Sequence, residues 1–361
     1  MIEKKIGFNF RSRFNFFRFS YEHEVRTMKK ILLALVSFLY FTTAFAVPYK
    51  KMVIFGDSLS DNGNLYKLDL HFLPKSPPYY NGRFSNGDVW SDTLTQRYFD
   101  RYHVTSTNYA YGGATSTGHN PWTDPSVPIT LTSELNEYLL QTVFQDKSDT
   151  LFIIWIGAND YFFNKTEEAD PLTSRVIDEI SKTIDTLVQN HAQFFLLPNL
   201  PDLSQTPLAR DHSDLSEKLH TFTLLHNKKL AAAIAEAKEK YPTVTFITVD
   251  IGSLFDDLLI NPEKYNQRYH INIQDVIHPC WSGGYTVRAE NMKEDHTIPA
   301  AILNSPDLYV AMNVSKQAAA RETACTDPEN RLFWDEMHPT APAHQILAGL
   351  FDEQLIAHGL G

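Results

Sequence analysis

The chain has 361 residues, of which 43% are hydrophobic and 21% charged, with 15 glycines and 19 prolines. This composition excludes a collagen-like or disordered chain and is sufficient for a buried core. Acidic residues outnumber basic ones by 43 to 32, a net charge of -11, which argues against a nucleic-acid-binding surface because such surfaces need clustered cations. Two cysteines are too few for a four-thiolate zinc site or a disulfide-scaffolded fold.

The first 46 residues predict a secretory signal peptide. Met28-Lys29-Lys30 is basic, Ile31–Thr43 is mostly apolar, and Ala44-Phe45-Ala46 has the small-x-small pattern of a cleavage site. The apolar stretch is shorter than the roughly 20 residues that a membrane span needs. We therefore expect cleavage before Val47 and a secreted protein, extracellular or periplasmic. Residues 1–27 form an unusual leader, so translation starting at Met28 is an alternative.

Removal of the leader makes the protein more acidic. Residues 1–46 hold 8 Lys/Arg and 3 Asp/Glu, so the remaining 315 residues carry 24 basic and 40 acidic side chains, a net charge of -16. No later apolar run approaches the length of a membrane span, so we expect only peripheral contact with membranes or micelles. The negative charge favours zwitterionic or dispersed lipid over anionic bilayers.

Residues 47–361 alternate short apolar runs with longer amphipathic ones, which predicts one domain built as a three-layer α/β/α sandwich on a mostly parallel five-stranded sheet. The expected strands are Lys51–Phe55, Val104–Tyr109, Leu151–Ile156, Gln193–Leu197 and Val244–Val249. The expected helices are Val89–Phe99, Leu131–Phe144, Leu172–His191, Ser213–Lys240 and Pro342–His358.

Two stretches do not follow this alternation. Residues 66–87 predict a long irregular loop after the first strand, and loops of that length usually carry function. Residues 261–335 have little periodicity and predict an insertion beside the site. Several aromatic residues either line an apolar acyl groove or close the core, and the sequence leaves both open. These residues are Phe72, Tyr79, Tyr80, Phe84, Tyr161, Phe162 and Phe163, whereas Trp155 lies within an expected strand and is assigned to the core.

The first expected strand leads into Gly-Asp-Ser-Leu-Ser, with Ser58 at the strand's carboxyl end, where doubly wound sheets bind ligands. A serine nucleophile needs a base and the base an orienting carboxylate, which His338 and Asp335 supply. Gly113 and Asn159 follow two further strands and are candidate oxyanion donors. Each motif alone also fits a turn, a helix cap or a surface pair. Their joint occurrence at the expected places favours an acyl-transfer site.

These motifs resemble the four sequence blocks of the GDSL, or SGNH, hydrolase superfamily, whose fold is flavodoxin-like. The matching segments are Gly56-Asp57-Ser58-Leu59-Ser60, Asn108-Tyr109-Ala110-Tyr111-Gly112-Gly113, Gly157-Ala158-Asn159-Asp160 and Asp335-Glu336-Met337-His338. The resemblance implies a nucleophile at Ser58 and a general base at His338 oriented by Asp335. It also implies an oxyanion hole formed by the Ser58 and Gly113 N–H groups and the Asn159 side chain. It implies no metal and no organic cofactor.

Further motifs are similar to the secreted bacterial phospholipases A, lysophospholipases A and glycerophospholipid:cholesterol acyltransferases, although plant-type GDSL esterases share them. These motifs are Asp61-Asn62-Gly63-Asn64, residues 81–90 and Leu197-Pro198-Asn199-Leu200-Pro201. We therefore expect a lysophospholipase A or phospholipase A that releases fatty acid from lysophospholipid or phospholipid through an acyl-serine. Acyl transfer to a sterol is an alternative second step. A carbohydrate acetylesterase, a short-chain esterase and a secreted lipid-binding module without catalysis are the other candidates.

The two cysteines predict one disulfide. In an exported protein Cys280 and Cys325 are expected to pair. The closed loop of 44 intervening residues would stabilise the fold by about 4 kcal/mol through the entropy of the unfolded chain. The insertion at 280–325 is then either a structural clasp or a lid that opens the site.

Overall fold

The computed structural model describes residues 29–30, 47–71, 73–116, 129–162, 164, 167–283 and 323–361. By its contacts the chain divides into two units, residues 1–46 and residues 47–361. The predicted signal peptide lies almost wholly outside the described residues, so it stays a prediction. Within the described ranges, no helix has both the length and the apolar character that crossing a membrane requires.

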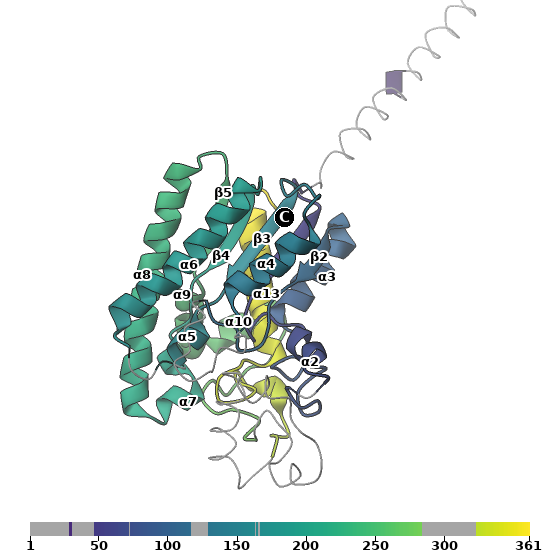
Figure 1. Cartoon of the computed structure of the whole chain (residues 1–361). Coiled ribbons are helices and arrows are strands. Elements are labelled where there is room, and N and C mark those ends of the chain that lie inside the picture. The colour runs from purple at the N-terminus through teal and green to yellow at the C-terminus, as the bar shows by residue number, and fades with distance from the viewer. Residues whose placement is uncertain are drawn as a thin grey trace, which may run out of the picture. The chain divides into compact units, whose positions relative to one another are not determined.

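The second unit is built on a five-stranded sheet in which all neighbouring strands are parallel (Figure 1). The strands are β1 (Lys51–Gly56), β2 (Thr105–Asn108), β3 (Thr150–Trp155), β4 (Phe194–Pro198) and β5 (Thr245–Val249). Their order in the sheet is β2-β1-β3-β4-β5. The chain passes from β1 to β2 and then returns across β1 to β3. The strand order therefore reverses at β1, the place where such sheets bind ligands.

The burial of each strand follows its place in the sheet. All six residues of the central strand β3 are buried, and five of six in β1, as expected of parallel strands covered on both faces. Strand β2 lies at the edge, and its Thr105, Ser106 and Thr107 are exposed. Short polar edge strands resist pairing with other chains. The apolar runs thus mark β1, β3, β4 and the other edge strand β5, whereas β2 is polar and two residues shorter than its predicted range.

Helices cover both faces of this sheet, which confirms the three-layer sandwich. The helices are α2 (Asn64–Leu68), α3 (Trp90–Tyr102), α4 (Leu131–Gln141), α5 (Ala158–Phe162), α6 (Ala169–Gln189), α7 (Pro207–Arg210), α8 (Ser213–Lys240), α9 (Ile251–Ile260), α10 (Pro262–Tyr269) and α13 (Ala341–Ala357), with short 3-10 turns η1 (Leu203–Gln205) and η3 (Pro328–Asn330). Helices α4, α6 and α8 pack along one face, and α3 packs with α13 on the other (Figure 1).

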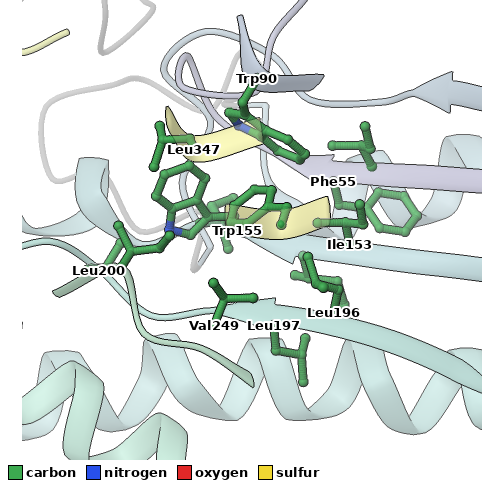
Figure 2. Close-up of a cluster of buried hydrophobic side chains, with 14 of the residues drawn as sticks. Phe55, Trp90, Ile153, Trp155, Leu196, Leu197, Leu200, Val249 and Leu347 are labelled. Carbon is green, nitrogen blue, oxygen red and sulfur yellow. The ribbon is translucent and has the colours of Figure 1, made fainter. Parts of the chain in front are cut away.

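The core between the sheet and helices α3 and α13 holds the strand ends in place. Figure 2 shows Ile153 and Trp155 of the sheet near Trp90 of α3 and Leu347 of α13, with the Trp90 and Trp155 ring centroids 6.2 Å apart. The Trp90 ring packs edge-on against Phe351, with ring centroids 4.6 Å apart. Burial of each such side chain contributes about 1.5–3 kcal/mol. The strand ends that carry the candidate site residues therefore rest on tightly packed side chains.

One predicted irregular region is partly helical. Helix α10 (Pro262–Tyr269) lies inside the 261–335 span, which was predicted to be an insertion with little periodicity and for which no helix was predicted. Its eight residues bury only Tyr265 and Asn266, so it has no apolar stripe from which a helical period could be recognised. It begins with Pro262 at a position where proline is favourable in helices. Residues 284–322 of the predicted insertion lie outside the described part.

Candidate active site

Ser58 lies in a tight turn directly after β1. The backbone N–H groups of Ser60 and Asp61 both donate to the Asp57 carbonyl at 2.9 Å, which folds the turn back on itself. A Cβ on Gly56 would lie 2.5 Å from the backbone carbonyl oxygen of Trp155, so the strand end requires glycine at this position. The Ser58 side chain is 7% exposed and faces a pocket.

Asp335, His338 and Ser58 form one chain of hydrogen bonds, as the motifs predict. The Nε2 atom of His338 lies 2.8 Å from Ser58 Oγ, across 280 residues of sequence. The Nδ1 atom lies 2.9 Å from each Asp335 carboxylate oxygen. A hydroxyl, an imidazole and a carboxylate in this order can activate a serine for attack on an ester. All three residues are buried.

The Asp335 carboxylate is held by more than the imidazole. Its Oδ1 accepts the backbone N–H groups of Met337 and His338, both at 2.8 Å, and its Oδ2 accepts the Tyr79 hydroxyl at 2.7 Å. Burial alone would raise the pKa of Asp335, but the His338 ring and these donors outweigh it and lower the pKa. Asp335 thus stays ionised. Tyr79 has a role that the sequence did not indicate, because nothing local links it to a residue 256 positions later.

The long loop after β1 packs behind the imidazole. The Phe84 ring centroid lies 5.1 Å from that of His338, and Tyr79 packs edge-on against Trp334. Leu65, Leu73, Tyr79, Phe84, Cys280, Trp281 and Trp334 form a separate buried apolar cluster, here named the loop cluster. For Tyr79 and Phe84 the structure therefore favours core closure over lining an acyl groove. Phe72 lies outside the described residues.

The two candidate oxyanion donors beyond Ser58 lie in neighbouring segments, Gly113 in the loop after β2 and Asn159 in helix α5. Asn159 Nδ2 donates to the backbone carbonyl of Ala114 at 3.0 Å, and the Asn159 side chain also faces the pocket of Ser58. Gly113, one residue before Ala114, has a φ of 72°, a conformation that favours glycine. Gly113 itself is not among the residues that line the pocket. The loop after β2 and the start of α5 are thus joined by a hydrogen bond beside Ser58.

Two further carboxyl groups flank the hydrogen-bonded chain. Burial raises the pKa of Asp57, which lines the pocket next to Ser58, to about 7. Burial, together with the charges of Asp335 and Asp211, raises the pKa of Glu336 to about 7. Neither group was singled out by the sequence. Among the described residues, no group of three or more His, Cys, Asp or Glu side chains is placed to hold a metal ion.

The pocket beside Ser58 has an empty volume of about 650 Å³, including the space at its open mouth. Its walls are mainly apolar and come from segments far apart in the chain: Leu59, Trp155, Ala158, Phe162, Pro201, Leu203, Ile251, Phe255, Phe333, Met337, Pro339 and Leu347 are among its lining residues. Most of these residues follow β4 and β5 or precede α13. Apart from Phe162, the sequence did not indicate these residues as pocket lining, because strands that end at the same sheet edge are distant in the chain.

The other aromatic candidates have different positions. Phe162 lines the pocket, whereas Tyr161 is buried in the core with its hydroxyl 2.7 Å from Nδ1 of His226. Tyr80 is 42% exposed. Trp155 is a core residue, as expected, and it also lines the pocket, while its Nε1 donates to the Asn199 carbonyl at 3.0 Å. Phe163 lies outside the described residues.

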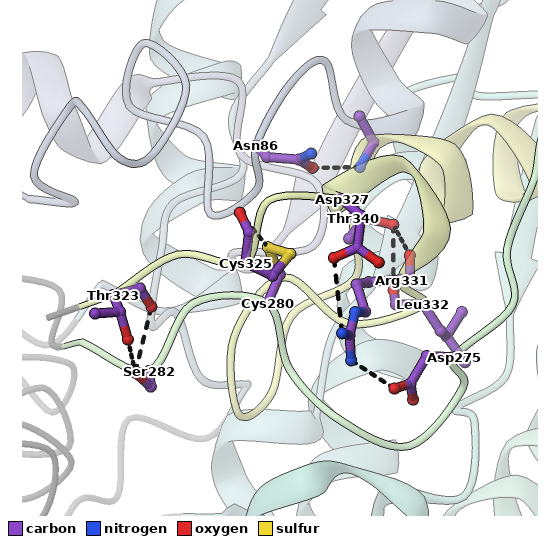
Figure 3. The surroundings of a disulfide bond; sticks show 11 residues. Asn86, Asp275, Cys280, Ser282, Thr323, Cys325, Asp327, Arg331, Leu332 and Thr340 are labelled. Atoms are coloured by element: carbon purple, nitrogen blue, oxygen red, sulfur yellow. Dashed lines mark hydrogen bonds and ion pairs between the residues drawn. A yellow bond between two sulfur atoms is a disulfide. The ribbon is translucent and has the colours of Figure 1, made fainter. Parts of the chain in front are cut away.

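Cys280 and Cys325 form the predicted disulfide (Figure 3). The Cys325 N–H donates to the Cys280 carbonyl at 2.8 Å, and the Trp281 N–H donates to the Trp334 carbonyl at 2.6 Å. Trp334 immediately precedes Asp335, so the disulfide closes next to the segment that carries the acid and the base. The hypothesis of a lid concerns the loop 281–324, of which residues 284–322 lie outside the described part, so it stays a hypothesis.

Comparison with known proteins agrees with these motifs. Residues 52–351 match the family model of the GDSL-like lipase/acylhydrolases. Phosphatidylcholine-sterol acyltransferase of Aeromonas hydrophila is 33% identical over 341 residues, covering 89% of this chain and 95% of that protein. Secreted effector protein SseJ of Salmonella typhimurium is 33% identical over 198 residues, covering 53% of this chain and 44% of that protein. Thermolabile hemolysin of Vibrio parahaemolyticus is 25% identical over 305 residues, covering 82% of this chain and 62% of that protein.

The match spans all five strands and all four motif blocks, from β1 to the last helix. The predicted resemblance to this family and to its bacterial acyltransferase branch is confirmed. The chain belongs to the GDSL-like lipase/acylhydrolase family, whose members act on ester bonds.

Proposed function

We propose that the protein is a serine acyl hydrolase that releases fatty acid from lysophospholipid or phospholipid. The observation that carries the proposal is the hydrogen-bonded chain of Asp335, His338 and Ser58 at the edge of a mainly apolar pocket. The hydrogen bonds supply the means of activating a nucleophile, and the pocket offers a place for an acyl chain.

In this proposal Ser58 is the nucleophile and His338 the general base. His338 Nε2 takes the proton of Ser58 Oγ as the oxygen attacks the ester carbonyl, and Asp335 orients and stabilises the imidazolium that forms. The oxyanion receives hydrogen bonds from the Ser58 and Gly113 N–H groups and the Asn159 side chain. His338 then protonates the departing alcohol oxygen, which leaves an acyl-serine. Water, activated by the same imidazole, hydrolyses the acyl-serine and restores Ser58.

Two observations favour a long acyl chain over an acetyl group. The aromatic and aliphatic pocket walls match a hydrocarbon chain, which gains free energy when it leaves water. The Aeromonas relative, 33% identical to this chain, is named a phosphatidylcholine-sterol acyltransferase, and this name supports a lipid substrate and a sterol acceptor here. We propose water as the main acceptor and a sterol hydroxyl as the second one. A carbohydrate acetylesterase is the competing assignment.

We also propose that the protein is exported after cleavage before Val47 and that residues 47–361 are one hydrolase domain. The amino-terminal motif supports export. The Cys280–Cys325 disulfide supports it independently, because disulfides persist mainly in oxidising compartments. Working outside the cytoplasm, the protein would meet its lipid in membranes or micelles without spanning them.

Product analysis tests the substrate assignment. The purified protein and its Ser58→Ala variant are incubated with lysophosphatidylcholine micelles, with phosphatidylcholine vesicles containing cholesterol, and with acetylated xylan. We expect the wild-type protein alone to release fatty acid from lysolipid, with cholesteryl ester as a minor product of the vesicles. Acetate release from xylan exceeding lipid hydrolysis would replace the proposal by the acetylesterase. Equal lipid hydrolysis by Ser58→Ala would exclude the serine mechanism.

A further inference from the structure

Asp61 lies three residues after Ser58 and joins the nucleophile turn to the loop that carries Gly113. Its side chain is 0% exposed and accepts four backbone N–H groups. Oδ1 accepts those of Gly63 at 2.8 Å and Asn64 at 2.6 Å, and Oδ2 accepts those of Leu65 at 3.2 Å and Gly112 at 2.8 Å. An ionised carboxylate offers about four lone-pair positions, so these donors satisfy it.

Three of the four bonds are local and one is not. The N–H groups of Gly63, Asn64 and Leu65 belong to the start of α2, so these bonds shape the chain next to Ser58. The N–H of Gly112 comes from the loop after β2, 51 residues away. Its neighbour in the chain is Gly113, whose N–H is the proposed oxyanion donor. The Asp61 carboxylate therefore binds the residue next to that donor, and Asp61 itself follows the nucleophile Ser58 by three positions in the chain.

The far side of the same loop is held by the third motif block. Asn159 Nδ2 donates to the Ala114 carbonyl at 3.0 Å, and Asp160 accepts the Ser116 N–H at 2.8 Å. Gly113 thus lies between a contact with Asp61 at residue 112 and a contact with Asn159 at residue 114. Two fixed points on either side of a glycine restrict a backbone that would otherwise be free to turn its N–H away.

We propose that Asp61 is a positioning residue. By holding the neighbouring Gly112 N–H, it orients the Gly113 N–H toward the place beside Ser58 Oγ where the oxyanion forms. The proposal rests on the proposed function, because the Gly113 N–H matters only where an oxyanion forms. Errors of about 1 Å in such a group can cost about 100-fold in rate. The carboxylate acts through the backbone of its neighbour and does not touch the substrate.

The position requires an ionised carboxylate. All four partners are N–H donors, so an asparagine amide would turn its own N–H₂ toward at least one of them. Gly112 has little freedom to adjust, because a Cβ at this position would already lie 2.3 Å from the Phe84 ring. Burial raises the pKa of Asp61 to about 6, while the hydrogen bonds from Gly112 and Asn64 act against the rise. At pH 7.5 the side chain is therefore charged and accepts all four bonds.

Asp61→Asn in the otherwise unchanged protein tests the proposal. The readouts are kcat and KM for a p-nitrophenyl ester, the affinity for an alkylboronic acid, which forms a tetrahedral adduct with Ser58, and the affinity for a non-cleavable ether lysolipid. We expect kcat and boronate affinity each to fall by about 100-fold, with KM and ether-lipid affinity changed less than threefold. This split separates positioning from general damage, which would weaken ether-lipid binding as well.

Asp352→Asn is the matched control. Asp352 is also buried, and its carboxylate pairs with Arg97 at 2.8 Å. Its charge acts on Tyr49, which precedes β1 at the end of the strand opposite Ser58. We expect Asp352→Asn to lower the melting temperature and to leave kcat unchanged. Unchanged kcat in a folded Asp61→Asn variant, with Ser58→Ala inactive, would overturn the inference while the proposed function stood. Full activity of Ser58→Ala would instead remove the proposed function.

A measurement on the wild-type protein covers the case in which Asp61→Asn does not fold. In protein labelled with ¹⁵N-glycine, we expect the Gly112 amide proton to resist exchange in the free protein and in the boronate adduct. We expect the Gly113 amide resonance to shift when the adduct forms. A Gly112 proton that exchanges as fast as an unbonded amide would overturn the inference. A Gly113 amide resonance that keeps its chemical shift when the boronate adduct forms would instead contradict the assignment of Gly113 to the oxyanion hole.

Discussion

Asn159→Ala separates the catalytic from the structural contribution of one side chain. The Asn159 amide has two hydrogens, and among the described residues only one is bonded, to the Ala114 carbonyl at 3.0 Å. The side chain lies in the wall of the pocket that Ser58 faces, so the second hydrogen is available to an oxyanion. The substitution removes both donors and leaves the hydrogen bonds between Ser58, His338 and Asp335 intact.

The two losses differ in size. Removal of one oxyanion donor typically costs about 2.7–4 kcal/mol in the transition state, which lowers kcat by about 100- to 1000-fold. Loss of the bond to the Ala114 carbonyl costs about 0.5–1.5 kcal/mol of folding stability. KM should change little, because a ground-state ester carbonyl carries less charge than the oxyanion. The expected result is therefore a folded protein with nearly normal binding and little turnover.

Steady-state kinetics and urea unfolding measure the two effects. Asn190→Ala is the matched control, since Asn190 Nδ2 donates to the Thr186 carbonyl at 2.9 Å at the end of α6, away from the pocket. We expect this control to lose a similar amount of stability and no activity. A kcat for Asn159→Ala within about threefold of the wild-type value would refute the oxyanion assignment, given the 100-fold minimum expected.

Three further predictions concern the surroundings of the site. The pKa of Glu336 is about 7 in the folded protein and about 4.5 in the unfolded chain, so its ionisation destabilises the fold as the pH rises from about 4.5 to 7. Glu336→Gln should therefore raise the free energy of unfolding by about 1–3 kcal/mol at pH 8 and leave it unchanged at pH 4. Equal gains in urea unfolding at both pH values would contradict this. Replacing both Cys280 and Cys325 by alanine should cost up to about 4 kcal/mol in urea unfolding, and no loss would show that the loop is already restrained in the unfolded chain. Phe255→Ala should enlarge the pocket, so that the p-nitrophenyl ester hydrolysed fastest has a longer acyl chain, and should lower the free energy of unfolding by about 3–5 kcal/mol. An unchanged chain-length profile would exclude Phe255 from the acyl site.

The sheet was predictable because most of its strands are short apolar runs in the sequence. The apolar runs at β1, β3 and β4 match inner strands buried on both faces, and β5 keeps such a run at the edge of the sheet. Their short length and their spacing, which leaves room for a helix after each, favour strands of a parallel sheet. The bounds of α8 (Ser213–Lys240) agree with the predicted range at both ends. Helix α10 was missed because eight mostly polar residues carry no helical period.

The site was predictable only in part, for a topological reason. The hydrogen-bonded residues lie in short motifs at strand ends, so sequence position alone places Ser58 and Asn159 at one edge of the sheet. The pocket wall is different, because Phe255 and Phe333 meet only through the folding of segments that have no motif. The Tyr79 hydroxyl on Asp335 is a contact of the same kind. Such pairs follow from packing, which a linear pattern does not encode.

Covalent labelling of Ser58 tests the central claim most directly. An alkyl fluorophosphonate reacts only with a serine whose proton a neighbouring base removes, so mass spectrometry of the labelled protein locates the nucleophile. We predict one label per chain, on Ser58, with esterase activity falling in proportion, and no label on Ser58→Ala or His338→Ala. Label on another serine, or full esterase activity in protein labelled at Ser58, would contradict the account.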